Sequence, residues 1–146
     1  MALAAERAAG AGGDVRVRAV QASDAGHEDV IASDGYIFAT PENLAAVSGV
    51  MKDFFDRTYY QVLDRIAGRP YALLICAGSD GSNAARQIER IATGWRLRAV
   101  REPLIVCTHA QTPEAILSEK LIAPEDLGRC AEVGMSLAMG LAMGIF

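Results

Sequence analysis

Residues 71–83 read Tyr71-Ala-Leu-Leu-Ile-Cys-Ala77 and then Gly78-Ser-Asp-Gly-Ser-Asn83. A short, uninterrupted apolar run bounded by turn residues predicts a strand that is buried on both faces. The two glycines predict a loop in which the backbone can turn sharply, and residues 84–93 predict a helix. This order of strand, loop and helix is typical of a parallel sheet covered by helices.

The flanking sequence continues the alternation of helix and strand. Apolar runs at 35–40 and 103–108 predict two more buried strands, and the alternating residues Val15 to Val20 predict a strand with one polar face. We therefore predict an α/β fold with a doubly wound parallel sheet. Further helices are predicted at 2–9, near 24–29, and at 48–66, 113–119 and 124–146. The side chains expected at the centre of the sheet are Ile37, Phe38, Leu73, Leu74, Ile75, Ile105 and Val106.

Length, charge and cysteine content limit the class of protein. The 146 residues predict one domain, 1–146, and 51% hydrophobic residues allow a core without a metal or a disulfide. The net charge of −4 argues against nucleic acid or an anionic membrane as a partner. The sequence has no apolar run of the roughly 18 residues that a membrane helix needs. Cys76, Cys107 and Cys130 lack the spacing of a metal site or a disulfide pair, which predicts reduced thiols in a cytoplasmic protein.

Two loops follow predicted strands at the end where parallel sheets bind ligands. Residues Thr40-Pro41-Glu42-Asn43-Leu44 offer donors and acceptors suited to the edge of a planar ring, and Pro41 stiffens the loop. Residues 77–82 combine polar side chains with Gly78 and Gly81, which permit close backbone approach. Taken singly, each loop is also explained as a strand-to-helix turn that binds no ligand.

Taken together, the loops carry a more specific pattern. The first loop is followed by a helix start with Ser48, Gly49, Lys52, Asp56 and Arg57, and the second is a small loop of glycine and serine. This arrangement resembles the flavodoxin-like NAD(P)H-dependent oxidoreductases, which include FMN reductases and quinone reductases. The C-terminal glycine- and alanine-rich segment, Gly134 to Gly144, is similar to the final helix of that family.

The resemblance implies a strand order of 2-1-3-4-5 and a non-covalently bound FMN. Electrons would pass from NADH or NADPH through the flavin to a quinone or a similar small acceptor. The chemistry would belong to the flavin, so no catalytic side chain is predicted. The family also implies a homodimer or homotetramer. The residues expected at the flavin are Thr40, Pro41, Glu42, Asn43 and Leu44 on one side of the ring, and Ala77, Gly78, Ser79, Asp80 and Gly81 at its pyrimidine edge and N5.

The N-terminal part departs from the family pattern. Such chains open with an apolar strand and a Ser/Thr-rich loop that holds the FMN phosphate. This sequence opens at a helix, and its first serine or threonine is Ser23. We therefore expect a domain that lacks the first strand, either because the gene start was assigned too late or because the chain is a degenerate homologue. The predicted strand at 15–20 would then lack its neighbouring strand. Without the phosphate-binding loop, the chain as given would bind FMN poorly and purify largely colourless.

A second class of function remains open beside the enzyme. The chain is alternatively a flavodoxin-fold structural or interaction domain that has lost its cofactor. A receiver domain of two-component signalling is excluded, because it needs a phosphoacceptor aspartate at the end of the central strand and a lysine near the last strand. Here the corresponding strand ends in Thr40-Pro41, and the residues from Leu104 to Glu119 include no lysine. His109 follows the last strand and is read either as a polar loop residue or as a proton donor to a quinone.

Overall fold

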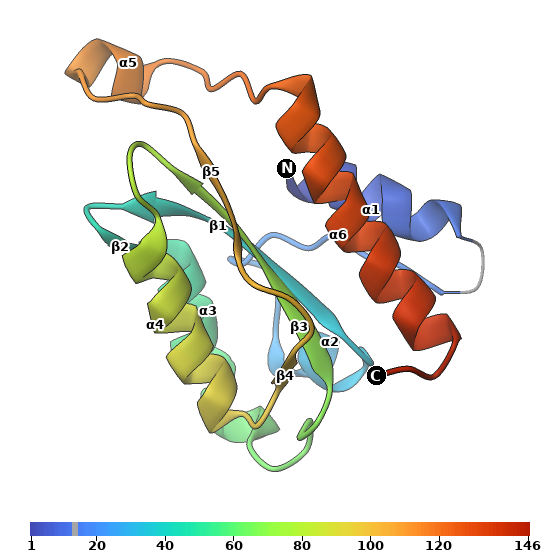
Figure 1. The fold of residues 1–146 in the computed structure, drawn as a ribbon. Helices are drawn as coiled ribbons and strands as arrows, with labels where there is room; N and C mark the ends of the chain where they lie inside the picture. Colours follow the sequence, from blue (N-terminus) through green and yellow to red (C-terminus); the bar gives the residue numbers. More distant parts are fainter. Residues whose placement is uncertain (13–14) are drawn as a thin grey trace.

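The computed structural model describes residues 1–12 and 15–146. Figure 1 shows a sheet between two helical layers, with α3 and α4 on one face and α1 and α6 on the other. The predicted α/β architecture with helices on both faces of the sheet is confirmed. The helices are α1 (Ala2–Ala11), α2 (His27–Ile31), α3 (Gly49–Val62), α4 (Ser82–Gly94), α5 (Pro113–Leu117) and α6 (Pro124–Ala142), and the strands are β1 (Tyr36–Asn43), β2 (Ala46–Val47), β3 (Pro70–Ala77), β4 (Arg98–Ala99) and β5 (Leu104–Cys107).

Strand β3 is the centre of the sheet. It pairs in parallel with β1 along one edge, from Tyr36 opposite Tyr71 to Pro41 opposite Cys76. Along its other edge it pairs in parallel first with β4 and then with β5. Strand β3, one of the strands that the sequence predicts to be buried, is therefore paired with each of the parallel strands β1, β4 and β5.

Two predictions about strands are corrected. Residues 15–20 form no strand, and within residues 1–12 and 15–146 the outer edge of β1 between Tyr36 and Pro41 has no paired strand. An alternating segment becomes a strand only where a neighbour accepts its backbone hydrogen bonds, so the local pattern was insufficient. The loop after β1 also contains an unpredicted antiparallel hairpin, in which β2 pairs with Glu42 and Asn43. Its two turn residues, Leu44 and Ala45, have φ of 51° and 56°.

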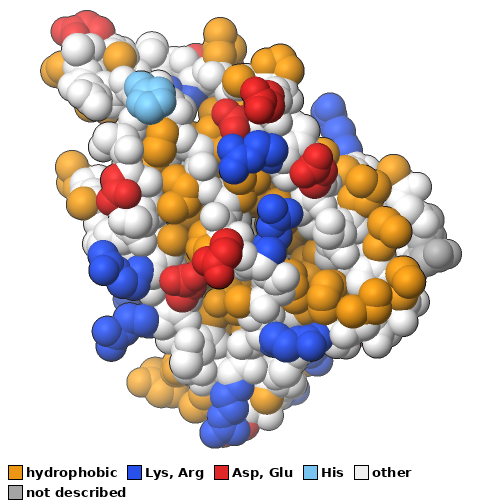
Figure 2. All heavy atoms as spheres, viewed as in Figure 1, with side chains coloured by type: hydrophobic (Ala, Val, Ile, Leu, Met, Phe, Trp, Pro, Cys, Tyr) orange, Lys and Arg blue, Asp and Glu red, His pale blue; other side chains and the backbone are white. Residues whose placement is uncertain are grey.

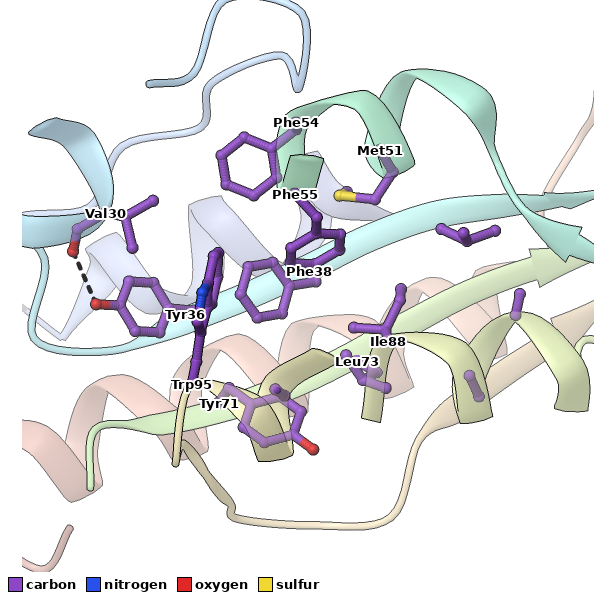
Figure 3. Packing of buried hydrophobic residues seen from close by; sticks show 14 of the residues in the cluster. Val30, Tyr36, Phe38, Met51, Phe54, Phe55, Tyr71, Leu73, Ile88 and Trp95 are labelled. Carbon is purple, nitrogen blue, oxygen red and sulfur yellow. Dashed lines mark hydrogen bonds between the residues drawn. The ribbon is translucent and has the colours of Figure 1, made fainter. Parts of the chain in front are cut away.

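An aromatic cluster fills the space between the sheet and helices α3 and α4 (Figure 3). The Phe38 ring on β1 lies 5.3 Å from the Phe55 ring on α3, and Phe55 lies 5.3 Å from Trp95. Trp95 is completely buried, and its indole nitrogen donates to the Tyr59 carbonyl at 3.1 Å. Truncating a buried aromatic of this kind to alanine typically costs about 3–5 kcal/mol, so this cluster anchors both helices to the sheet.

A smaller apolar cluster lies on the opposite face, under helices α1 and α6. It joins Leu74 of β3 and Leu104 of β5 to Val133 of α6. Helix α1 packs closely on α6, because a Cβ placed on Gly134 would overlap the backbone of Ala5. Of the seven predicted central side chains, Ile37 and Ile105 are half-buried and the other five are buried.

Side chains satisfy the ends of several helices. Ser48 accepts from the Met51 amide at 3.4 Å, which confirms it as the predicted cap of α3. At the other end of the sheet, the Arg69 guanidinium donates to the carbonyls of Val30 and Ile31, at 3.2 and 2.8 Å, and so closes the C-terminus of α2. None of the helices in the described ranges is long and apolar enough to cross a membrane.

Candidate functional site

The two predicted loops lie side by side at the carboxyl edge of the sheet. Strands β1 and β3 run in parallel and in register, so the residues that follow Thr40 and Ile75 emerge at the same end. Strand β5 ends there too, with Cys107 opposite Ala77. Figure 1 shows helix α5 beyond this same edge. This is the position at which open α/β sheets bind their ligands.

Four hydrogen bonds tie the β1–β2 hairpin to helix α4. Glu42 uses both carboxylate oxygens: Oε2 accepts from the Gly81 amide at 2.9 Å and Oε1 accepts from the Ala84 amide at 3.3 Å. The Asn83 side chain donates to the Ala45 carbonyl at 2.5 Å. The Val47 amide donates to the Gln87 side chain at 3.0 Å. The two candidate loops therefore form one connected unit.

The first loop divides into inward and outward residues. Thr40 is buried, and its hydroxyl lies 2.8 Å from the Ser48 hydroxyl, within hydrogen-bonding distance. Glu42 is half-buried, and its carboxylate already accepts hydrogen bonds from amides at the start of α4. Pro41, Asn43 and Leu44 are exposed. The exposed residues are the ones available to a ligand, and Leu44 presents a fully exposed apolar side chain at the hairpin tip.

Glycine in the second loop is required by packing as well as by conformation. Gly81 has φ of +80°, and a Cβ there would lie 2.6 Å from Cγ2 of Ile105. A Cβ on Gly78 would lie 2.9 Å from the carbonyl oxygen of Ala110. Ala77 is buried at the base of the loop, while Ser79 and Asp80 are exposed at its tip. The loop thus presents polar side chains and backbone from a fixed base.

The end of β5 contributes Thr108, which the sequence did not single out, beside Cys107 and His109, which it did. The Thr108 amide and hydroxyl both donate to the Ala77 carbonyl, at 2.8 and 3.2 Å. Cys107 lies beside the second loop, with its sulfur 3.4 Å from the Ser79 carbonyl. His109 has φ of 55° and an exposed side chain. Its position directly after a parallel strand was the only sequence signal for Thr108.

The pKa of the Cys76 thiol, near the end of β3, is raised chiefly by burial. This thiol is therefore less ionised at neutral pH than an ordinary cysteine, and it is correspondingly less nucleophilic.

Two surface hollows of about 220 and 440 Å³ lie away from the candidate loops. The first is lined mainly by α3 residues, and the second lies between α6 and the connection from β4 to β5.

The exposed groups of the joined loops suit the edge of a planar heteroaromatic ring. The Asn43 side chain supplies a donor and an acceptor, and Ser79 and Asp80 supply further polar atoms. Leu44 and Pro41 supply apolar surface beside them. The exposed residues therefore offer the kinds of polar and apolar group that could contact the ring of FMN, the cofactor that the family resemblance implies.

The sequence model of the NADPH-dependent FMN reductase family matches residues 13–112, which include both loops. The chain belongs to this family. A search of curated protein sequences finds no match. Membership makes the chain a relative of flavin-dependent oxidoreductases, and it confirms the family resemblance that the sequence motifs indicated.

Comparison with solved structures supports the flavodoxin-like fold of this family member. The flavodiiron protein from Giardia intestinalis aligns over 98% of the chain with a TM-score of 0.73 at 17% identity, but the chain spans only 32% of that protein. A flavodoxin from the domain Archaea aligns over 96% of the chain and 90% of its own length, with a TM-score of 0.70 at 15% identity. An oxidoreductase from Corynebacterium diphtheriae aligns over 94% and 82%, with a TM-score of 0.64 at 22% identity.

Proposed function

We propose that the protein is an FMN-dependent oxidoreductase that accepts a hydride from NADH or NADPH and passes electrons to a quinone or a similar small acceptor. The observation that carries this proposal is the joining of the two loops at the carboxyl edge of a parallel sheet, in a chain of the FMN reductase family. Bound FMN would supply the electron transfer itself, and the loops would bind and orient its ring.

The chain's own residues would divide the work of binding. Asn43 and Ser79 would hydrogen-bond the rim of the ring, and Leu44 would shield one part of it from water. Gly81 would keep the backbone of the second loop close to the sheet. The apolar side chain at the hairpin tip is compatible with a planar, apolar acceptor such as a quinone.

Titration of FMN into the purified chain, followed by quenching of flavin fluorescence, tests the proposal. We expect weak, saturable binding that Asn43→Ala weakens further and that Ser136→Ala, on the distant helix α6, leaves unchanged. Oxidation of NADH and of NADPH is then measured with a quinone as acceptor, which identifies the preferred donor. If the wild-type chain binds no FMN, the remaining function is that of a flavodoxin-fold interaction domain.

We further propose that the protein acts in the cytoplasm as a homodimer or homotetramer. The three cysteines are free thiols, which suits a reducing compartment. Helix α6 exposes Met135 and Met139, and Met143 at its C-cap is exposed four residues further on. Flexible apolar side chains of this kind are used at protein contacts. The stripe of these three methionines is the surface at which we expect a second copy to bind.

A further inference from the structure

The N-terminus of helix α4 is capped by a side chain from strand β1. The N-cap residue of α4 is Gly81, which has no side chain with which to cap the helix. The first turn of a helix presents backbone amides that need acceptors and carries a partial positive charge. Glu42, which lies 39 positions earlier in the sequence than Gly81, supplies both acceptors through its two carboxylate oxygens.

The chemistry of this cap is specific to glutamate. A carboxylate presents two acceptor oxygens and no donor, so it can serve the Gly81 and Ala84 amides at once. Glutamine keeps one oxygen but turns an NH₂ group toward the second amide, and alanine leaves both amides without this acceptor. The attachment of the hairpin to the start of α4 is therefore expected to weaken in the order glutamate, glutamine, alanine at position 42.

The same carboxylate fixes the position of the ligand-facing part of the second loop. Ser79 and Asp80 are exposed, and they lie between the buried end of β3 and the Gly81 amide that Glu42 holds. On the other side of the link, Asn43 directly follows Glu42 in the hairpin. Movement of the Glu42 side chain would thus displace exposed groups of both loops relative to each other.

We propose that Glu42 is a positioning residue for the flavin, which acts through the Gly81 and Ala84 amides and does not contact the ring. This inference rests on the proposed function. Both oxygens of Glu42 are engaged, and the side chain is half-buried between the loops. Its effect on the flavin is to hold the two loops at one fixed separation before the ligand arrives, which reduces the ordering cost of binding.

The test compares Glu42→Gln and Glu42→Ala with Arg69→Ala. Arg69 closes helix α2 at the opposite end of the sheet, so its removal lowers stability without touching the loops. Hydrogen exchange of the Gly81 and Ala84 amides is measured without flavin, and the FMN dissociation constant is measured by fluorescence where every variant remains folded. We expect faster exchange at both amides and FMN binding weaker by about tenfold in Glu42→Gln, and by about a hundredfold in Glu42→Ala.

The matched control separates positioning from general stability. Arg69→Ala is expected to keep amide protection at Gly81 and to bind FMN within about twofold of the wild type. If Glu42→Ala speeds exchange but leaves the FMN dissociation constant unchanged, or if Arg69→Ala weakens FMN as much as Glu42→Ala, the inference is wrong. If the wild-type chain itself binds no FMN, the proposed function fails and the inference fails with it, a result distinct from a loss confined to the Glu42 variants.

Discussion

Single glycines set the conformation of the second loop. Gly81 has φ of +80° and faces the side chains of Ile75 and Ile105, whereas Gly68 has a similar φ of +82° but would meet open space if it carried a Cβ. The two positions therefore share the backbone requirement and differ in packing. A substitution at Gly68 therefore reports the cost of the left-handed backbone alone, whereas a substitution at Gly81 reports that cost together with steric overlap.

Gly81→Ala is expected to destabilise the protein more than Gly68→Ala. Left-handed backbone costs an alanine roughly 1–2 kcal/mol at either position. Overlap with the isoleucine side chains adds roughly 1–3 kcal/mol at position 81 alone. Urea unfolding of both variants measures the difference in the free energy of unfolding. Equal losses at the two positions would show that the loop relaxes away from Ile105.

Asp29 makes stability depend on pH. Its carboxylate accepts from the Gly26 amide at 2.9 Å and pairs with Arg18 at 2.6 Å. These contacts, the Gly26 hydrogen bond first, lower its pKa in the folded protein. A depressed pKa stabilises the fold above the unfolded value of about 3.9, and this stabilisation is lost as the pH falls through the folded value.

Asp29→Ala is accordingly expected to cost about 1 kcal/mol at pH 7, the size of a helix-capping contribution. The difference from the wild type should shrink as the pH falls below about 4, because the carboxylate of the unfolded chain takes up a proton there before the folded carboxylate, whose pKa is lower, does. Unfolding in urea at pH 7, 5 and 3 measures this trend. Asp29→Asn, which keeps an acceptor oxygen without the charge, is the control and should lose less. A difference that stays constant down to pH 3 would contradict the assignment.

At the scale of whole elements, helix α6 shows how one glycine permits two helices to meet. Gly134 lies against the backbone of Ala5 in α1, whereas Gly128, in the same helix, faces open space. We expect Gly134→Ala to destabilise the fold by roughly 1–3 kcal/mol, because the added methyl group pushes α1 away. Gly128→Ala should stabilise it by up to about 1 kcal/mol, since alanine is the better helix former. Thermal unfolding of both variants checks the opposite signs.

The elements that the sequence predicted well are those with a strong local signal. The apolar run of β3 and the serine cap of α3 placed both elements within a few residues of their observed starts. The segment at 15–20 had an equally clear alternation but forms no strand, because pairing depends on a neighbouring strand and not on the segment itself. The β1–β2 hairpin was missed because its turn uses Leu44 and Ala45, neither of which favours positive φ.

The candidate site was predicted in position but not in its internal contacts. The ends of β1 and β3 follow from the pattern of parallel strands, so both loops were placed at one edge. The bonds from Glu42 to Gly81 and Ala84 join residues about 40 positions apart, and no local periodicity reports such a contact. Side-chain direction at a strand end is set by tertiary packing, which one sequence does not reveal.

At the scale of the whole molecule, the methionine stripe on α6 carries the prediction about assembly. Figure 2 shows hydrophobic side chains gathered over the region of α1 and α6 on the face in view. Met139 is 51% exposed, between Met135 and Met143. We expect Met139→Glu to shift the protein toward the monomer, because assembly would bury an unpaired charge. Light scattering at micromolar concentration measures this.

Gln61→Glu adds the same charge on an exposed position of α3 and should leave the assembly unchanged. A wild-type protein that is already monomeric at these concentrations would refute the proposed homo-oligomer.

The contact between α1 and α6 has a consequence for synthesis on the ribosome. The first helix of the chain packs on the last, and Ala5 and Gly134 are separated by almost the whole sequence. At roughly 5–20 residues per second, α1 is made roughly 6–26 seconds before the segment it packs against. A helix of this length is marginal in isolation. During that interval α1 has no partner helix to pack on, and it can dock against α6 only after α6 has emerged from the exit tunnel.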